Sequence, residues 1–271
     1  MSRIALTVSY DGRGFDGWQT QPDGNTVQDS LQHALGEVAQ RPIKVVCAGR
    51  TDAGVHALRQ VVHFDAPVER PMTAWVRGVN SHLPSAIAIE QASQVRPEFH
   101  ARFDATGRQY QYLLRVSASQ DPFWAGRAGW VFRSVDIARM RAAAKCLVGT
   151  HDFSAFRSSQ CQAKTPIRTL ESVTIEGSDE LILFTFNGNA FLHHMIRNLI
   201  GSLIYVGQAR QPVEWLRGVL AGGDRALAAP TFMPDGLYFC GAHYRADDPV
   251  PGPSTLLAPA FNPGFGRSHD A

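Results

Sequence analysis

The order of strand-like and helix-like segments is the feature that most constrains this chain. In residues 3–95, apolar residues repeat with period two in some segments and with the helical period in others. The predicted order is strand, helix, strand, strand, helix, strand, which is typical of the split βαβ unit. The strands cover residues 3–10, 43–48, 59–65 and 86–95, and the helices residues 26–39 and 73–81. In the first helix, Asn25 and Gln28 match a capping box.

The second half of the chain repeats this order loosely. Its predicted strands are residues 107–116, 169–176, 180–187 and 237–244, and its predicted helices are residues 135–147, 190–206 and 212–221. We therefore expect an α+β fold of two split βαβ (ferredoxin-like or RRM-like) halves, residues 1–105 and 106–245. The halves would share a central, mostly antiparallel sheet with helices on its outer faces. The groove between them would be the natural binding surface.

Residues 246–271 differ in composition from the body of the chain. They hold five of the 16 prolines together with Gly252, Gly264 and Gly266. We expect a poorly ordered tail.

Composition excludes several classes of protein. The 271 residues are 44% hydrophobic and 18% charged, with a mean hydropathy of −0.15, which is an ordinary globular profile. No stretch approaches about 18 uninterrupted apolar residues, so we expect no membrane span. Residues 1–8 look like a strand rather than a signal peptide. The four cysteines form no CxxC pair, which favours reduced thiols over a structural zinc site.

The basic residues are dominated by arginine. Only Lys44, Lys145 and Lys164 are lysines among 26 basic residues, and the formal net charge is +2. Arginine suits bidentate contacts with phosphate. A composition bias of the source genome explains the same numbers, so this feature alone does not require nucleic acid.

Two further patterns are weak. Residues 12–17 match GxGxxG after a strand, but Pro22 and Gly24 occur where a dinucleotide-binding fold needs a helix, so we expect no nucleotide cofactor. His193 and His194 are adjacent, and a helix would point them about 100° apart. We predict no metal site, and we interpret both histidines as surface or hydrogen-bonded groups rather than catalytic ones.

Residues 49–57, GRTDAGVHA, form a stronger pattern. Asp52 lies between Gly49 and Gly54, two residues after Arg50, and glycines let the chain turn tightly beside a ligand. An arginine nearby favours an ionised carboxylate, which can act as nucleophile, base or metal ligand. The alternative is a turn held by an Asx hydrogen bond and a surface ion pair.

This motif resembles the catalytic motif of tRNA pseudouridine synthases of the TruA family. The other matching stretches occur in the family's order across residues 3–245. They are Tyr10-Asp11-Gly12, Gly17-Trp18-Gln19, Phe99-His100-Ala101-Arg102-Phe103, Arg108-Gln109-Tyr110-Gln111-Tyr112, His151-Asp152-Phe153, Phe156-Arg157, residues 191–198 (FLHHMIRN) and Gly236-Leu237-Tyr238.

The resemblance implies the pseudouridine synthase fold and an isomerase of the cytoplasm. Its substrate would be uridine at positions 38, 39 and 40 of the tRNA anticodon stem-loop. The reaction breaks the N1–C1′ bond, turns the uracil and joins C5 to C1′, so its atoms balance without a cofactor. The expected partners are tRNA and a second copy of the chain in a homodimer.

The resemblance also assigns roles to five residues. Asp52 would be the essential catalytic aspartate. Tyr110 would stack on the flipped base, Arg197 would pair with Asp52, Arg50 would contact phosphate or displace the base, and Leu237 would form an apolar wall. Without the resemblance, Tyr110 would be interpreted as a core residue and Arg197 as a solvated helix charge. We therefore predict that Asp52 and Arg197 meet within about 4 Å, with Tyr110 beside them.

Two other classes of function compete with this interpretation. A non-catalytic RNA-binding module would explain the split βαβ halves but not Arg50-Thr51-Asp52, and the RNP-type aromatic signature is missing. A nucleotide-dependent oxidoreductase would depend on the GxGxxG match alone. Product formation from unmodified tRNA, without nucleotide or metal, separates all three.

Overall fold

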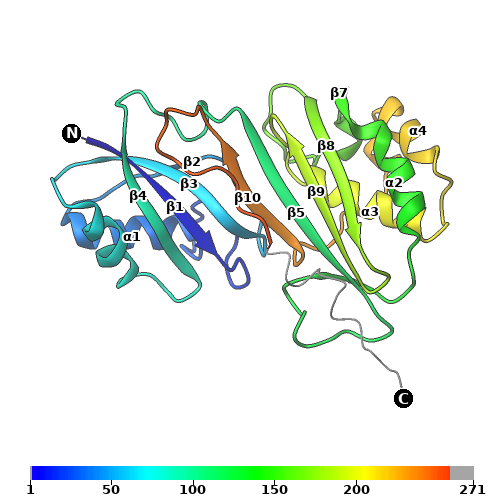
Figure 1. Cartoon of the computed structure of the whole chain (residues 1–271), viewed down its shortest axis with the longest axis horizontal. Helices are drawn as coiled ribbons and strands as arrows, with labels where there is room; N and C mark the ends of the chain where they lie inside the picture. Colours follow the sequence, from blue (N-terminus) through cyan, green and yellow to red (C-terminus); the bar gives the residue numbers. More distant parts are fainter. Residues whose placement is uncertain (1, 257–271) are drawn as a thin grey trace, which may run out of the picture.

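The computed structural model describes residues 2–256 and places ten strands in one mixed sheet. The order of strands along the sheet is β4-β1-β3-β10-β5-β9-β8-β7, with β2 paired to β3 and β6 to β5. The sheet runs the length of the molecule, with helices gathered near its two ends (Figure 1). This arrangement confirms the α+β class expected from the sequence.

The first half is a split βαβ unit. It consists of β1 (Ser2–Tyr10), α1 (Val27–Ala39), β2 (Val46–Cys47), β3 (His56–Ala66), a π-helical turn (Ala74–Gly78) and β4 (Ile87–Val95). β1 lies between β3 and β4 and is antiparallel to both. The second half consists of β5 (Gly107–Val116), β6 (Gly129–Val131), α2 (Ile137–Ala144), β7 (Gly149–Asp152), β8 (Ile167–Gly177), β9 (Leu181–Gly188), α3 (Met195–Gly207), α4 (Trp215–Gly222) and β10 (Leu237–His243).

The two halves meet where β10 pairs with β3. This pairing is parallel and short, joining Tyr238 to His56 and Phe239 to Ala57. β3 begins directly after the GRTDAGV segment, so the loop that carries Asp52 opens at the seam between the halves. The location agrees with the groove expected from the sequence, while the proposed domain boundaries stay a prediction.

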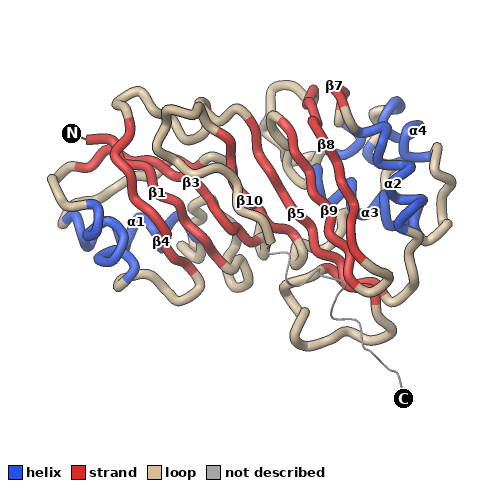
Figure 2. The backbone as a smooth tube through the Cα atoms, in the orientation of Figure 1, coloured by secondary structure: helices blue, strands red, loops and turns tan. Residues whose placement is uncertain are grey.

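Most of the core lies on one face of the sheet. Side chains alternate along a strand, and Tyr110, Tyr112 and Leu114 of β5 join a core that also holds Leu31 of α1 and Leu199 of α3. Leu113 of β5 belongs to a separate small cluster. Helices of both halves therefore contribute to one shared core. The sheet continues from the first half of the chain to the second without a break (Figure 2).

Local side-chain bonds explain where element boundaries differ from the sequence prediction. The strand expected over 43–48 shrinks to β2, because the Val45 N–H donates to Gln32 Oε1 rather than to a neighbouring strand. Thr26, not Asn25, caps α1, and its Oγ1 accepts from the Asp29 N–H. The helix expected from residue 190 begins only at Met195, because His194 has a φ of 63°.

The first part of the predicted tail contacts the sheet. Arg96 Nε donates to buried Asp248 at 3.1 Å, and Arg59 donates to the Gly252 carbonyl at 2.9 Å. The Leu256 N–H donates to Gln111 Oε1 at 2.8 Å. Residues 246–256 thus contact the sheet through one side-chain and two backbone hydrogen bonds, while the order of the tail stays a prediction. Residues 257–271 lie outside the described part.

Candidate active site

Side chains from neighbouring strands hold the Gly49–Gly54 loop in place. Gln60 of β3 bonds to both backbone groups of Gly49, accepting from its N–H at 3.4 Å and donating to its carbonyl at 2.6 Å. The hydroxyls of Tyr10 and Thr51 hydrogen bond at 2.8 Å, and both side chains are buried. The loop is therefore pinned on both sides of Arg50, next to Asp52.

The glycines of the GxGxxG pattern support this same loop. A Cβ on Gly12 would lie 2.1 Å from the Val55 carbonyl oxygen, and one on Gly17 would lie 2.8 Å from that of Thr51. Gly17 also has a φ of +94°, which other residues rarely adopt. The Trp18 N–H then donates to the Thr51 carbonyl at 3.0 Å. The pattern thus lets one loop pack closely against another.

His56 joins this region to the second half of the chain. Its Nδ1 accepts from the Gly12 N–H at 3.1 Å, and its Nε2 donates to the carbonyls of Gly126 and Asp235 at 2.9 and 3.2 Å. Burial lowers the pKa of His56, which agrees with a neutral ring that donates from one nitrogen and accepts at the other. We infer a positioning role for His56.

Three basic side chains surround the Asp52 carboxylate. Arg197 Nη1 of α3 donates to Oδ2 at 3.1 Å. His193 Nε2 lies 3.3 Å from Oδ1, and His194 Nε2 lies 3.5 Å from Oδ2. The prediction that Asp52 and Arg197 meet is confirmed, and the Asp52 side chain keeps 19% of its surface exposed. A substrate can therefore still reach the carboxylate.

The electrostatic balance keeps Asp52 ionised. Burial alone would raise its pKa, but the His193 hydrogen bond, the charges of both histidines and the Arg197 hydrogen bond outweigh burial and lower the pKa. The Asp52 hydrogen bond raises the pKa of His193, whereas desolvation lowers that of His194. His193 is thus the histidine more readily charged beside the carboxylate.

The two histidines are the part of the site that the sequence interpretation missed. It assumed that both lie on a helix, but His194 adopts the left-handed conformation just before α3. Their rings then lie 4.0 Å apart, centroid to centroid, and both face Asp52. No signal in the sequence pattern marked the pair, because the helix was expected to begin at residue 190.

Tyr110 lies beside this cluster. Its ring packs against Phe191 and Phe239 with centroids 5.1 and 5.0 Å away, and a Cβ on Gly49 would lie 3.6 Å from its hydroxyl. Burial is the main cause that raises the Tyr110 pKa, and the charges of Tyr10 and Asp52 raise it further. Its hydroxyl has no hydrogen-bond partner within residues 2–256, whereas that of Tyr112 donates to the Met233 carbonyl at 3.0 Å. Of these two tyrosines, only Tyr110 has a hydroxyl without a partner in residues 2–256.

The other two predicted site residues, Arg50 and Leu237, differ in exposure. Arg50 is exposed and has no ion pair with another described residue, so it is available at the rim. Leu237 is buried in the core and pairs with Tyr112 across β10 and β5. On the same strand, the Phe239 ring packs against Tyr110.

Asp52, His193 and His194 also have the spacing of possible metal ligands. One donor atom from each lies within 4.8 Å of the others. However, Oδ2 of Asp52 already accepts from Arg197, and a guanidinium beside a cation is unfavourable. The arrangement therefore fits a positioned carboxylate better than a metal centre.

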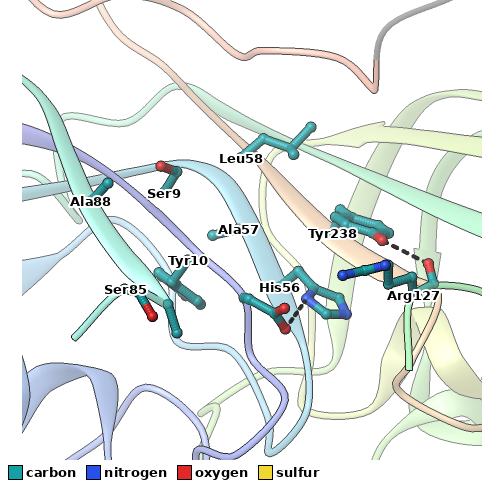
Figure 3. A pocket seen from close by; sticks show the side chains of 11 residues that line it. Ser9, Tyr10, His56, Ala57, Leu58, Ser85, Ala88, Arg127 and Tyr238 are labelled. Carbon is teal, nitrogen blue, oxygen red and sulfur yellow. Dashed lines mark hydrogen bonds and ion pairs between the residues drawn. The ribbon is translucent and has the colours of Figure 1, made fainter. Parts of the chain in front are cut away.

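A hollow of about 340 Å³ is lined by residues of β1, β3 and β10 (Figure 3). Its lining includes Ser9, His56, Arg127 and Tyr238, and the rings of His56 and Tyr238 stack with centroids 4.6 Å apart. Asp52, Tyr110 and Arg197 do not line it. This hollow is therefore not formed by the side chains around Asp52.

A partly buried carboxylate that basic side chains keep ionised, in a seam between two half-domains, is an arrangement typical of an enzyme site. The family profile described as "tRNA pseudouridine synthase" matches residues 6–104 and 143–245. The chain belongs to this family, and it is an isomerase that acts on tRNA.

Curated relatives extend the match over almost the whole chain. A tRNA pseudouridine synthase A of Paraburkholderia xenovorans is 54% identical over 96% of both chains. One of Herminiimonas arsenicoxydans is 57% identical over 89% of this chain and 90% of its own. Among solved structures, a chain of the archaeal box H/ACA sRNP Nop10–Cbf5 complex is 13% identical with a TM-score of 0.36, over 84% of this chain and 59% of that one.

Within residues 2–256, no helix combines the length and the apolar character needed to span a bilayer. The four cysteines, Cys47, Cys146, Cys161 and Cys240, are all free thiols.

Proposed function

We propose that this protein converts uridine to pseudouridine at positions 38, 39 and 40 of the tRNA anticodon stem-loop. One observation carries the proposal most directly: the carboxylate of the family motif, Asp52, is ionised, partly accessible and paired with Arg197 from the other half of the chain. Both halves of the chain contribute side chains at this carboxylate, so groups of both halves can surround a base that has been flipped out of an RNA stem. The target positions come from the resemblance of the GRTDAGVHA motif.

Each residue of the cluster has a role in this proposal. The Asp52 carboxylate attacks the flipped nucleotide or assists the cleavage of its N1–C1′ bond. Arg197 and the two histidines hold the carboxylate oxygens in place and keep them charged. The pairing also limits which oxygen faces the substrate, because Oδ2 is shared by Arg197 and His194.

Tyr110 acts on the base rather than on the sugar. Its ring provides a flat face for the flipped uracil, held between Phe191 and Phe239. Its hydroxyl, kept protonated by the raised pKa, relays the proton that leaves C5 once the new C5–C1′ bond has formed, releasing its own proton as it takes up that one. N1 of the base gains a proton, so the reaction stays an isomerisation. Leu237 contributes to the apolar support under this face.

Arg50 contacts the RNA backbone beside the flipped nucleotide. An exposed guanidinium without a protein partner costs little to transfer to a phosphate, and it replaces a condensed counterion. We further propose that two copies form a homodimer on one tRNA, and that the enzyme works in the cytoplasm with its substrate.

The test is product mapping on unmodified tRNA, without added nucleotide or metal. Pseudouridine at positions 38–40 supports the proposal. Pseudouridine elsewhere in the tRNA would refute the target positions alone. Binding of tRNA without product would refute the reaction, and size measurements with and without tRNA would test the homodimer.

A further inference from the structure

An exposed aromatic side chain stands close to the loop that carries Asp52. Phe103, in the turn between β4 and β5, has 75% of its surface exposed. Phenylalanine is among the residues most often fully buried. An exposed ring that is held firmly in place is therefore a candidate contact surface.

Neighbouring groups fix the Phe103 ring without covering it. His100 stacks on one face of the ring, with centroids 4.2 Å apart and an interplanar angle of 26°. The N–H groups of Arg102 and Phe103 both donate to His100 Nδ1 at 3.2 Å, which fixes the imidazole in turn. The ring is thus preorganised while most of its surface faces solvent.

Arg108 ties this turn to the catalytic loop. Its Nη2 donates to the Arg102 carbonyl at 2.6 Å and to the Ala48 carbonyl at 3.3 Å. Ala48 directly precedes the Gly49–Gly54 loop. Phe103, the residue after Arg102, is thus tied through Arg108 to the start of the loop that carries Asp52.

The charges around Phe103 are not compensated within the protein. Arg102 lies over the ring, with its guanidinium carbon 5.7 Å from the centroid. Arg50 and Arg102 are both exposed, and neither has an ion pair with a residue in the described part of the chain. An aromatic face flanked by free guanidinium groups matches a single nucleic-acid strand, in which bases alternate with phosphates.

We propose that Phe103 is a stacking platform for a tRNA base next to the flipped uridine, with Arg50 and Arg102 on the adjoining phosphates. This inference rests on the proposed function, because it assumes a nucleotide drawn out of its stack. Flipping leaves the neighbouring base with one uncovered face. Phe103 covers that face, which offsets part of the cost of extrusion and tolerates any base, since every base has a π-face.

The experiment compares the wild type with Phe103→Leu and Phe103→Trp on an unmodified tRNA transcript. Phe103→Leu keeps an apolar side chain but removes the π-face. We expect it to raise the KM for tRNA about tenfold or more, with a smaller change in kcat, while Phe103→Trp stays close to wild type. Thermal unfolding of both variants should match wild type, because the side chain is exposed.

Phe132→Leu is the matched control. The Phe132 ring is 61% exposed, and the Arg133 guanidinium lies 5.3 Å from its centroid, but it comes after β6 rather than beside the catalytic-loop stem. We expect its KM to stay within twofold of wild type. A tRNA with 2-aminopurine beside the target uridine adds a direct readout, because stacking on Phe103 should quench its fluorescence and Phe103→Leu should abolish that quenching.

The platform is refuted if Phe103→Leu keeps a wild-type KM, if Phe103→Trp loses as much as Phe103→Leu, or if Phe132→Leu loses as much as either. These outcomes all require a wild-type enzyme that makes pseudouridine. A wild type that binds tRNA but forms no pseudouridine would instead refute the proposed function. Binding and product mapping thus tell the two failures apart.

Discussion

Asp52 and Arg197 lie 145 positions apart in the sequence, and their side chains meet with 3.1 Å between Arg197 Nη1 and Asp52 Oδ2. One belongs to the loop before β3 and the other to the first turn of α3. Arg197 is further fixed because its Nε donates to the Phe232 carbonyl at 2.8 Å. The reactive carboxylate is therefore complete only when both halves of the chain are folded together.

Replacing Arg197 should change the pH dependence of turnover. The pKa of Asp52 is low because His193, His194 and Arg197 outweigh its burial. Activity that needs the carboxylate is present above this pKa and lost as the pH falls through it. Arg197→Ala leaves the burial but removes one partner, so the acid limb of kcat should move to higher pH. The pH profile of single turnovers measures this shift.

The Arg197 prediction separates an electrostatic role from a binding role. We expect the tRNA dissociation constant of Arg197→Ala to change less than its kcat. An unchanged acid limb, together with a large loss of tRNA affinity, would show that Arg197 acts as an RNA contact.

The two histidines should affect stability with opposite signs of pH dependence. The folded-state pKa of His193 is raised, so its contribution is present below the ordinary histidine value of about 6.5 and is lost as the pH rises through the raised pKa. The pKa of His194 is lowered, so the folded state loses stability as the pH falls through 6.5 and the unfolded state takes up the proton.

Urea unfolding of His193→Gln and His194→Gln between about pH 5 and 8 tests these signs. The stability of wild type relative to His193→Gln should decline as the pH rises, and that relative to His194→Gln should increase. Parallel curves for the two variants would contradict the assignment of charge within the pair.

Tyr110 and Tyr112 should respond differently to loss of their hydroxyls. The Tyr110 hydroxyl has no partner in the described structure, so Tyr110→Phe should leave the free energy of unfolding within about 0.5 kcal/mol of wild type while lowering kcat tenfold or more. Tyr112→Phe removes the bond to the Met233 carbonyl and should cost about 1 kcal/mol of stability, with turnover near wild type.

Kinetics and unfolding of both tyrosine variants provide the comparison. Normal turnover by Tyr110→Phe would leave Tyr110 a stacking role only. Normal turnover by Tyr110→Ala, which also removes the ring, would exclude Tyr110 from the site.

Binding of tRNA should depend strongly on salt, because phosphate contacts release counterions. Each contact contributes about −0.7 to −0.9 to the slope of log K against log salt concentration. We expect the slope for wild type to correspond to several phosphate contacts. The slope for Arg50→Ala should be shallower by the contribution of about one contact. A salt-independent affinity, or an unchanged slope for this variant, would contradict the contact.

The sequence predicted the parts of this protein that depend on local pattern. Period-two apolar stretches located β1, β5 and β9 closely, and the motif around Asp52 predicted its meeting with Arg197 through the family resemblance. The histidine pair was missed because one left-handed residue, His194, reverses where the side chains point. β7 was also missed, since this edge strand has only four residues, which pair with β8.

Bonds between distant segments explain the other differences. The composition of residues 246–271 predicted poor order. It did not indicate that Asp248 accepts a hydrogen bond from Arg96, or that the Leu256 N–H donates to Gln111, 145 positions away. GxGxxG could be rejected as a cofactor motif because the residues after it favour a loop over a helix. Its actual use, close packing against Thr51 and Val55, requires three-dimensional contacts.

Pseudouridine mapping with wild type and Asp52→Asn tests the central claim most directly. The amide is nearly isosteric with the carboxylate, but it is neither an anion nor an effective nucleophile, so the variant should fold and bind tRNA as wild type does. We predict pseudouridine at positions 38–40 from wild type and none detectable from Asp52→Asn. Turnover by Asp52→Asn within about tenfold of wild type, a barrier change below about 1.4 kcal/mol, would contradict the account.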